Sequence, residues 1–140
     1  MSIVFPIEGR NHMLGVTLHG EAAFPTWYIA LFEGDYTPTD GLTAATFPGL
    51  ATECTAYAES TRREFVESAP VGGASDNSAS LAQFTMTAAK RIYGFAILSA
   101  SAKGALTGKV LCAQRLASPK DYDIGDVVKV PVNLTLITAP

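Results

Sequence analysis

The sequence predicts an all-β protein, an antiparallel β-sandwich of jelly-roll type that forms a single domain over residues 1–140. The first reason is the C-terminal stretch 127–137, where apolar and polar residues alternate with period two. Pro131 within it cannot donate to a sheet, which predicts an edge strand or a bulge there. The second reason is a series of further strand-like segments, separated by turn residues at the spacing of a sandwich or barrel. The third is that 140 residues, 48% of them hydrophobic, suffice for one core.

The N-terminal part contains one ambiguous segment and one clear strand. Residues 8–18 are compatible with a short helix or a loop, because three apolar residues share a helical face while two glycines weaken a helix. Residues 26–33 are aromatic and β-branched and end at Gly34 and Asp35, which predicts a strand. Trp27 within this strand is expected to anchor the core rather than to stack on a sugar.

The middle of the chain predicts several strands. Short strands are expected at 53–57 and 64–67, followed by a flexible turn region over 68–80. Residues 81–88 alternate between apolar and polar, as in a half-buried strand. Residues 92–98 are apolar on both faces, which predicts a central strand.

The connections between the later strands are also predicted. Lys90 and Arg91 lie between two expected strands, which predicts a tight hairpin at this point. Small residues over 99–108 predict a loop. A strand is expected over 109–116 and a turn segment over 117–126, after which the terminal strand begins.

Charge and hydropathy argue against two classes of partner. Only 16% of the residues are charged, against an average of about 25%, and the formal net charge is −3. The ten lysines and arginines form no basic stripe, so we expect no nucleic-acid binding. No apolar run approaches the length of a membrane span, and the N-terminus lacks the features of a signal peptide. We therefore expect synthesis in a cytoplasm and no membrane partner.

Neither the histidines nor the cysteines predict a metal site. His12 and His19 are seven residues apart, but no further ligands stand at zinc-binding spacing around them, so exposed or capping roles are favoured. Cys54 and Cys112 lie in strand-like contexts, where two buried free thiols are favoured over a disulfide in a reducing compartment.

The acidic residues and glycines do not form a recognisable catalytic motif. A glycosidase needs two carboxylates facing each other across a cleft, which spacing alone does not establish, so solvated loop acids are favoured. The six candidates are Glu33, Asp35, Glu53, Glu59, Glu64 and Glu67. Residues 121–126 do not have a glycine and a distal glutamate at the positions that an EF-hand calcium loop requires, and residues 103–109 lack the spacing of a phosphate-binding loop. We expect no enzymatic activity, no metal and no cofactor.

Several stretches, taken in order, resemble a family of small structural proteins of tailed bacteriophages. The stretches are 9–14 (GRNHML), 26–33 (TWYIALFE), 36–38 (YTP), 45–48 (ATFP), 53–62 (ECTAYAESTR), 77–80 (NSAS), 101–108 (SAKGALTG) and 125–128 (GDVV). The size and β content are also similar to those of capsid cement proteins, including a jelly-roll cement protein of a Bordetella phage. The resemblance brings no catalytic motif with it.

The resemblance implies a virion protein that binds the assembled capsid lattice and stabilises it, with the major capsid protein as partner. Two alternatives remain open. One is a tail or head–tail connector protein; the other is a carbohydrate-binding module or glycosidase of a phage receptor apparatus. The number of copies per particle separates the structural roles, because a cement protein covers a whole lattice and a connector forms a single ring.

The long loop over residues 34–51 is the first candidate for a partner contact. It is built of Thr, Gly, Pro and Asp but contains four apolar residues that can anchor an interface. These are Tyr36, Leu42, Phe47 and Leu50. The alternative is that they fold back and cover the end of the sandwich. Low charge and small-residue loops also predict self-association, as a homodimer or another homo-oligomer, which would strengthen a weak contact by avidity.

Overall fold

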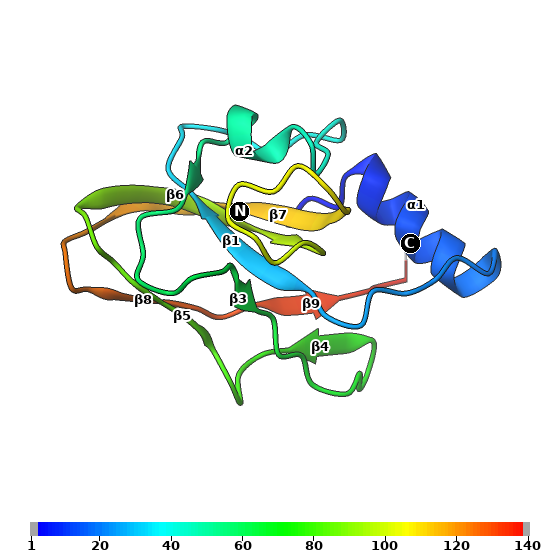
Figure 1. The fold of residues 1–140 in the computed structure, drawn as a ribbon. Coiled ribbons are helices and arrows are strands. Elements are labelled where there is room, and N and C mark those ends of the chain that lie inside the picture. Colours follow the sequence, from blue (N-terminus) through cyan, green and yellow to red (C-terminus); the bar gives the residue numbers. More distant parts are fainter. Residues whose placement is uncertain (1–2, 139–140) are drawn as a thin grey trace.

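The backbone forms two layers of antiparallel strands, with one helix at an end of the sandwich (Figure 1). The computed structural model describes residues 3–138. The helices are α1 (Ile7–Leu18) and α2 (Phe47–Leu50). The strands are β1 (Tyr28–Phe32), β2 (Glu53–Cys54), β3 (Arg63–Glu64), β4 (Ala74–Asp76), β5 (Ala82–Thr85), β6 (Lys90–Leu98), β7 (Val110–Tyr122), β8 (Val127–Val130) and β9 (Asn133–Thr135). The predicted all-β sandwich with a short N-terminal helix is confirmed.

The larger layer is a sheet centred on β1 and β6. Its order is β2–β1–β6–β7, and β3 also pairs with β1. Every pairing in it is antiparallel. Strand β6 is hydrogen-bonded on both edges and buried on both faces from Gly94 to Leu98, which confirms the central strand predicted at 92–98.

The second layer consists of two separate two-stranded sheets, β5–β8 and β4–β9. Both pairs join strands that are distant in the sequence, as expected when the chain crosses repeatedly between the layers. The alternation predicted over 81–88 holds, because Ala82, Phe84 and Met86 are buried while Gln83 and Thr87 are exposed.

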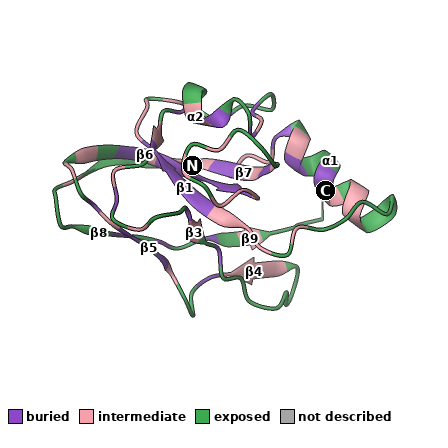
Figure 2. Ribbon diagram, viewed as in Figure 1, coloured by how far each residue is buried: buried purple, intermediate pink, exposed green. Residues whose placement is uncertain are grey.

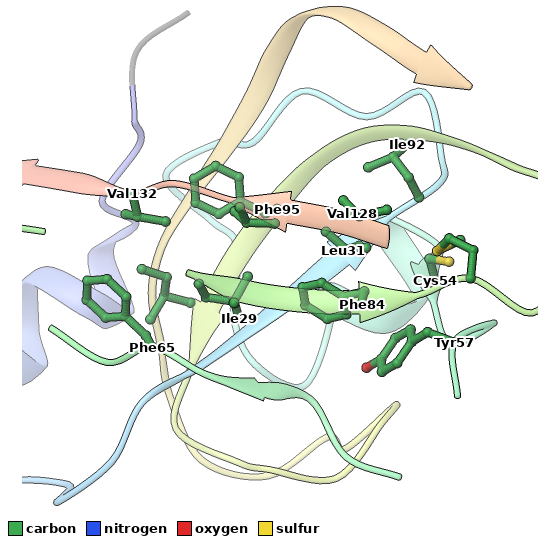
Figure 3. Close-up of a cluster of buried hydrophobic side chains, with 14 of the residues drawn as sticks. Ile29, Leu31, Cys54, Tyr57, Phe65, Phe84, Ile92, Phe95, Val128 and Val132 are labelled. Carbon is green, nitrogen blue, oxygen red and sulfur yellow. The ribbon is translucent and has the colours of Figure 1, made fainter. Parts of the chain in front are cut away.

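A hydrophobic core fills the space between the two layers (Figure 3). One face of the large sheet contributes Ile29, Leu31 and Ile97, and the second layer contributes Phe84 and Val128. Four of these side chains are 0–1% exposed, and Val128 is 3% exposed. Burying one side chain of this size is worth about 1.5–3 kcal/mol, so this cluster contributes strongly to stability.

The opposite face of the large sheet has a core of its own, which the 34–51 segment covers. Phe32, Ala96 and Leu98 point to this side and pack against residues that include Leu42 and Phe47. The segment therefore is not wholly irregular, because it contains α2 and buries apolar residues on the sheet (Figure 2).

The predicted hairpin at Lys90 and Arg91 is wrong. Both residues lie inside β6, and β5 pairs with β8 rather than with β6. The short connection after Met86 instead carries the chain from the second layer to the large sheet. Neighbouring strands in the sequence therefore belong to different sheets, which a local pattern does not reveal.

The turn segment predicted over 117–126 is also partly wrong, since β7 continues to Tyr122. A large bulge interrupts its pairing, because Ile92 faces Lys120 while Gly94 already faces Arg115. A side chain at position 94 would collide with the carbonyl oxygen of Gln114 and the ring of Phe32, so the close approach of the strands requires glycine here.

The C-terminal alternation extends over two strands that are separated at Pro131. Strand β8 ends before this proline and β9 starts after it, which agrees with the predicted edge or bulge. Buried Asn77 bridges the interruption: its Nδ2 donates to the oxygen of Val130 at 2.9 Å, and its Oδ1 accepts from the amide of Val132 at 2.8 Å. The amide group of one side chain thus replaces the missing strand pairing.

Helix α1 is confirmed. Gly9, one of the two glycines that weaken the helix prediction, explains how the helix is attached to the sheet. A Cβ at Gly9 would overlap the backbone oxygens of Val110 and Leu111, so the absence of a side chain lets the helix lie directly on β7. One carboxylate oxygen of Glu8 accepts from the amides of Ala44 and Val110, each at 2.8 Å. These contacts fix α1 to both the large sheet and the 34–51 segment.

Candidate interaction surface

The four predicted contact residues do not share one surface. Leu42 and Phe47 are 0% exposed and belong to the core beneath the 34–51 segment. Tyr36 is partly buried against the same core, with its ring 6.0 Å from that of Phe32. Only Leu50, which is 56% exposed, reaches the surface. Leu42 and Phe47 therefore fold back onto the sandwich, as in the alternative to a partner contact.

A different apolar surface runs along α1. Leu14 and Leu18 are 58% and 77% exposed, and Leu136 beyond β9 is 70% exposed. Leu136 and α1 line a common hollow of about 410 Å³. Figure 1 shows the chain running from β9 towards α1. We call this region, consisting of the exposed side of α1 together with Leu136, the α1 surface.

A buried histidine supports the α1 surface from behind. His12 is 5% exposed, and its Nδ1 lies 3.0 Å from Oε1 of Glu21. Its ring packs against Phe24 and Trp27 at centroid distances of 5.0 and 5.5 Å. The predicted exposed or capping role is wrong for His12 and correct for His19, which is exposed and caps the end of α1 with its backbone amide.

A buried ion pair, which sequence reasoning missed, organises the loops at another side of the large sheet. Arg62 is 0% exposed and donates to both carboxylate oxygens of Glu53, at 2.9 and 2.7 Å. Arg62 also donates to the carbonyl oxygens of Ala100 and Ala105. Glu53 is therefore not a solvated loop acid, as expected, because it links the 53–62 region to the 99–108 loop.

The remaining candidate carboxylates mostly have structural partners. Glu33 pairs with Lys90 at 3.1 Å and Asp35 pairs with Arg115 at 2.6 Å. Glu59 accepts from the amide and the hydroxyl of Thr85, both at 2.9 Å. Among residues 3–138, no three His, Cys, Asp or Glu side chains converge as a metal site would require.

Both cysteines are buried and free, as predicted. Burial raises the pKa of the Cys54 thiol to about 11 and that of the Cys112 thiol to about 12. Thiols with such pKa values remain protonated near neutral pH and are poor nucleophiles. Their arrangement therefore indicates packing rather than chemistry.

A comparison with known protein families gives a match. The profile of a family described as Gp80, podophage GP4 fiber I protein gp80, matches residues 9–138. No curated protein matches the chain. Within the described residues, neither helix is long and apolar enough to cross a membrane.

Proposed function

Since this chain belongs to the family of the podophage GP4 fiber I protein gp80, we propose that it is a structural subunit of a fibre on a bacteriophage particle. The family match over residues 9–138 carries this proposal, because it covers nearly the whole chain. The match identifies a bacteriophage structural protein and a virion component. The assignment to a fibre is more specific and is our proposal. It corresponds to the tail alternative rather than to a position on the capsid surface.

The side chains support a role without catalysis. Glycoside hydrolysis needs two carboxylates that are free to act as acid and as base or nucleophile. Here Glu53 is committed to Arg62, Glu33 to Lys90 and Glu59 to Thr85. Glu64 and Glu67 are exposed, as expected of solvated acids. We therefore propose that any glycan contact of the fibre is binding alone, and that the purified protein leaves capsular polysaccharide intact.

A capsid cement protein is the second candidate. The two-layer sandwich supports it, and so does Leu50, which is exposed on the segment that covers the large sheet. A weakly charged surface can also pack on a protein lattice with little desolvation cost. In this role the partner is the major capsid protein.

Copy number in purified virions distinguishes the two candidates. Quantitative mass spectrometry measures the ratio of this chain to the major capsid protein. A fibre subunit gives about a few dozen copies per particle or fewer, because fibres are attached at a limited number of symmetric positions. A ratio near one copy per capsid subunit would contradict the fibre assignment and favour cement. Absence from purified virions would contradict both.

A further inference from the structure

We infer that the α1 surface binds a second copy of this chain, with the two α1 helices packed antiparallel across a two-fold axis. The inference builds on the proposed function, because fibres are assembled from repeated copies. The proposed contact is thus made by the α1 surface, which the sequence did not suggest, and not by the 34–51 segment.

The spacing of the exposed residues is that of a helix–helix seam. Ile7, Asn11, Leu14 and Leu18 follow one another at intervals of four, three and four residues, and all four are exposed. This is the a/d spacing of helices that pack knobs into holes. Three of the four residues, Ile7, Leu14 and Leu18, are apolar, so this row of side chains can pack against the same row on a second copy.

The shape of the region is complementary to itself. The four seam residues project from α1 as a ridge. The other residues of α1 that line the two hollows lie on opposite sides of this ridge around the helix axis, so one hollow runs along each side. One hollow, of about 360 Å³, adjoins Ile7 and Asn11, and the other, of about 410 Å³, adjoins Leu14 and Leu18. In a two-fold arrangement, the ridge of each copy enters a hollow of the other, as ridges and grooves do in packed helices.

Charge and area also fit a contact between identical surfaces. A two-fold axis brings each charged group close to its own copy, so an unpaired charge would repel. Arg10, the basic residue of α1, is neutralised by Asp40 at 3.3 Å. Ile7, Leu14, Leu18 and Leu136 are each 51–77% exposed, so together they offer roughly 300–500 Å² of apolar area. A standard interface takes about 800 Å² from each partner, of which somewhat more than half is apolar.

Sedimentation equilibrium of the purified full chain tests this inference. The wild type should have twice the 14.7 kDa mass of one chain. The double variant Leu14→Glu/Leu18→Glu should be monomeric, with an unchanged far-ultraviolet circular dichroism spectrum, because both side chains are exposed. Leu106→Glu is the matched control: Leu106 is 60% exposed on the 99–108 loop, and this variant should remain a dimer.

Cross-linking tests the antiparallel arrangement. In an antiparallel pair Asn11 of one copy faces Leu14 of the other, so Asn11→Cys/Leu14→Cys should form intermolecular disulfides. Leu18→Cys alone should not, because the two copies of this residue lie at opposite ends of the seam. Cys54 and Cys112 are buried and give no background. A monomeric wild type, a dimeric double glutamate variant, or cross-linking through Leu18→Cys alone would each overturn the inference. The copy number of the chain in purified virions is measured separately and tests the proposed function.

Discussion

At the scale of single residues, the Glu53–Arg62 pair is the most costly group to bury and therefore the most informative one to remove. Both side chains are 0–2% exposed, and the guanidinium also donates to two carbonyl oxygens. The net stabilisation by an intact buried ion pair is smaller than the loss of stability when one partner is removed. The loss is large because the remaining charge is left unpaired in a medium of low dielectric constant.

Replacing Arg62 by methionine should lower the free energy of unfolding by about 3–5 kcal/mol, as is typical when one partner of a buried pair is removed. Urea denaturation measures the loss. The control is Arg91→Met, which breaks the exposed bidentate pair with Asp121 and should cost at most about 1 kcal/mol. Equal losses in the two variants would show that the Glu53–Arg62 pair is not buried in solution.

Glu59 predicts a specific pH dependence of stability. Desolvation acts to raise its pKa, but hydrogen bonds from the Thr85 amide and hydroxyl outweigh it, so the pKa is lowered in the folded protein. A carboxyl with a lowered folded pKa stabilises the protein above its unfolded pKa, and this contribution disappears as the pH falls through the folded pKa. Glu59→Gln should therefore melt at a lower temperature than the wild type at pH 7, and this difference in melting temperature should vanish on acidification. A constant difference from neutral to acid pH would contradict this origin.

The two thiols should be unreactive in the folded protein. Their pKa values of about 11 and about 12 keep both protonated at pH 8, and burial blocks access. A colorimetric thiol assay should show slow reaction in buffer and rapid reaction of both cysteines in urea. Ala102→Cys, at an exposed position, is the matched control and should react at once. Rapid reaction of the native wild type would show that its core opens.

At the scale of elements, the C-terminal segment changes from core to surface within a few residues. Val132 is 3% exposed, whereas Leu136, four residues later in the same alternation, is 70% exposed. The change occurs along β9, which pairs with β4: Val132 lies beside the bridge made by Asn77, and Leu134 is only partly buried against the core.

This change predicts opposite results for the same substitution. Val132→Asp places a charge against the core and should cost several kcal/mol, because an unpaired buried charge is expensive. Val127→Asp, at the 45% exposed start of the same segment and outside the α1 surface, should alter stability by about 0.5 kcal/mol or less, as is usual for exposed positions. Thermal melts of both variants measure the difference. Similar melting temperatures for the two would contradict the register of this segment.

The sequence predicted those elements whose pattern is local. The alternation over residues 81–88 reflects the burial of one face, the apolar run 92–98 reflects the burial of both faces, and the structure confirms both predictions. The length of β7 was missed because the small and exposed residues 117–119 form a bulge and resemble a turn. The Glu53–Arg62 pair was missed because its further partners, Ala100 and Ala105, lie about forty residues away along the chain. The sequence shows that apolar residues of α1 share a helical face, but it does not reveal that Leu14 and Leu18 on this face are exposed.

At the scale of the whole molecule, one sheet carries two cores. The inner core joins it to the second layer, and the outer core joins it to the 34–51 segment, so a rigid body results with α1 at one end. The residues predicted as contacts mostly stabilise this body, while five of the eleven exposed large apolar residues of the described chain lie on α1 or beyond β9. Such a division is suited to a structural subunit, because the fold remains stable while one surface is left for assembly.

A cryo-electron microscopy reconstruction of the purified particle tests the fibre assignment most directly. The two-layer sandwich with α1 at one end is distinctive enough to be placed in density at the resolution of secondary structure. Our account predicts that it fits a fibre projecting from the particle, with neighbouring copies in contact through α1. Density for this fold spread over the capsid lattice, with none in a fibre, would contradict it.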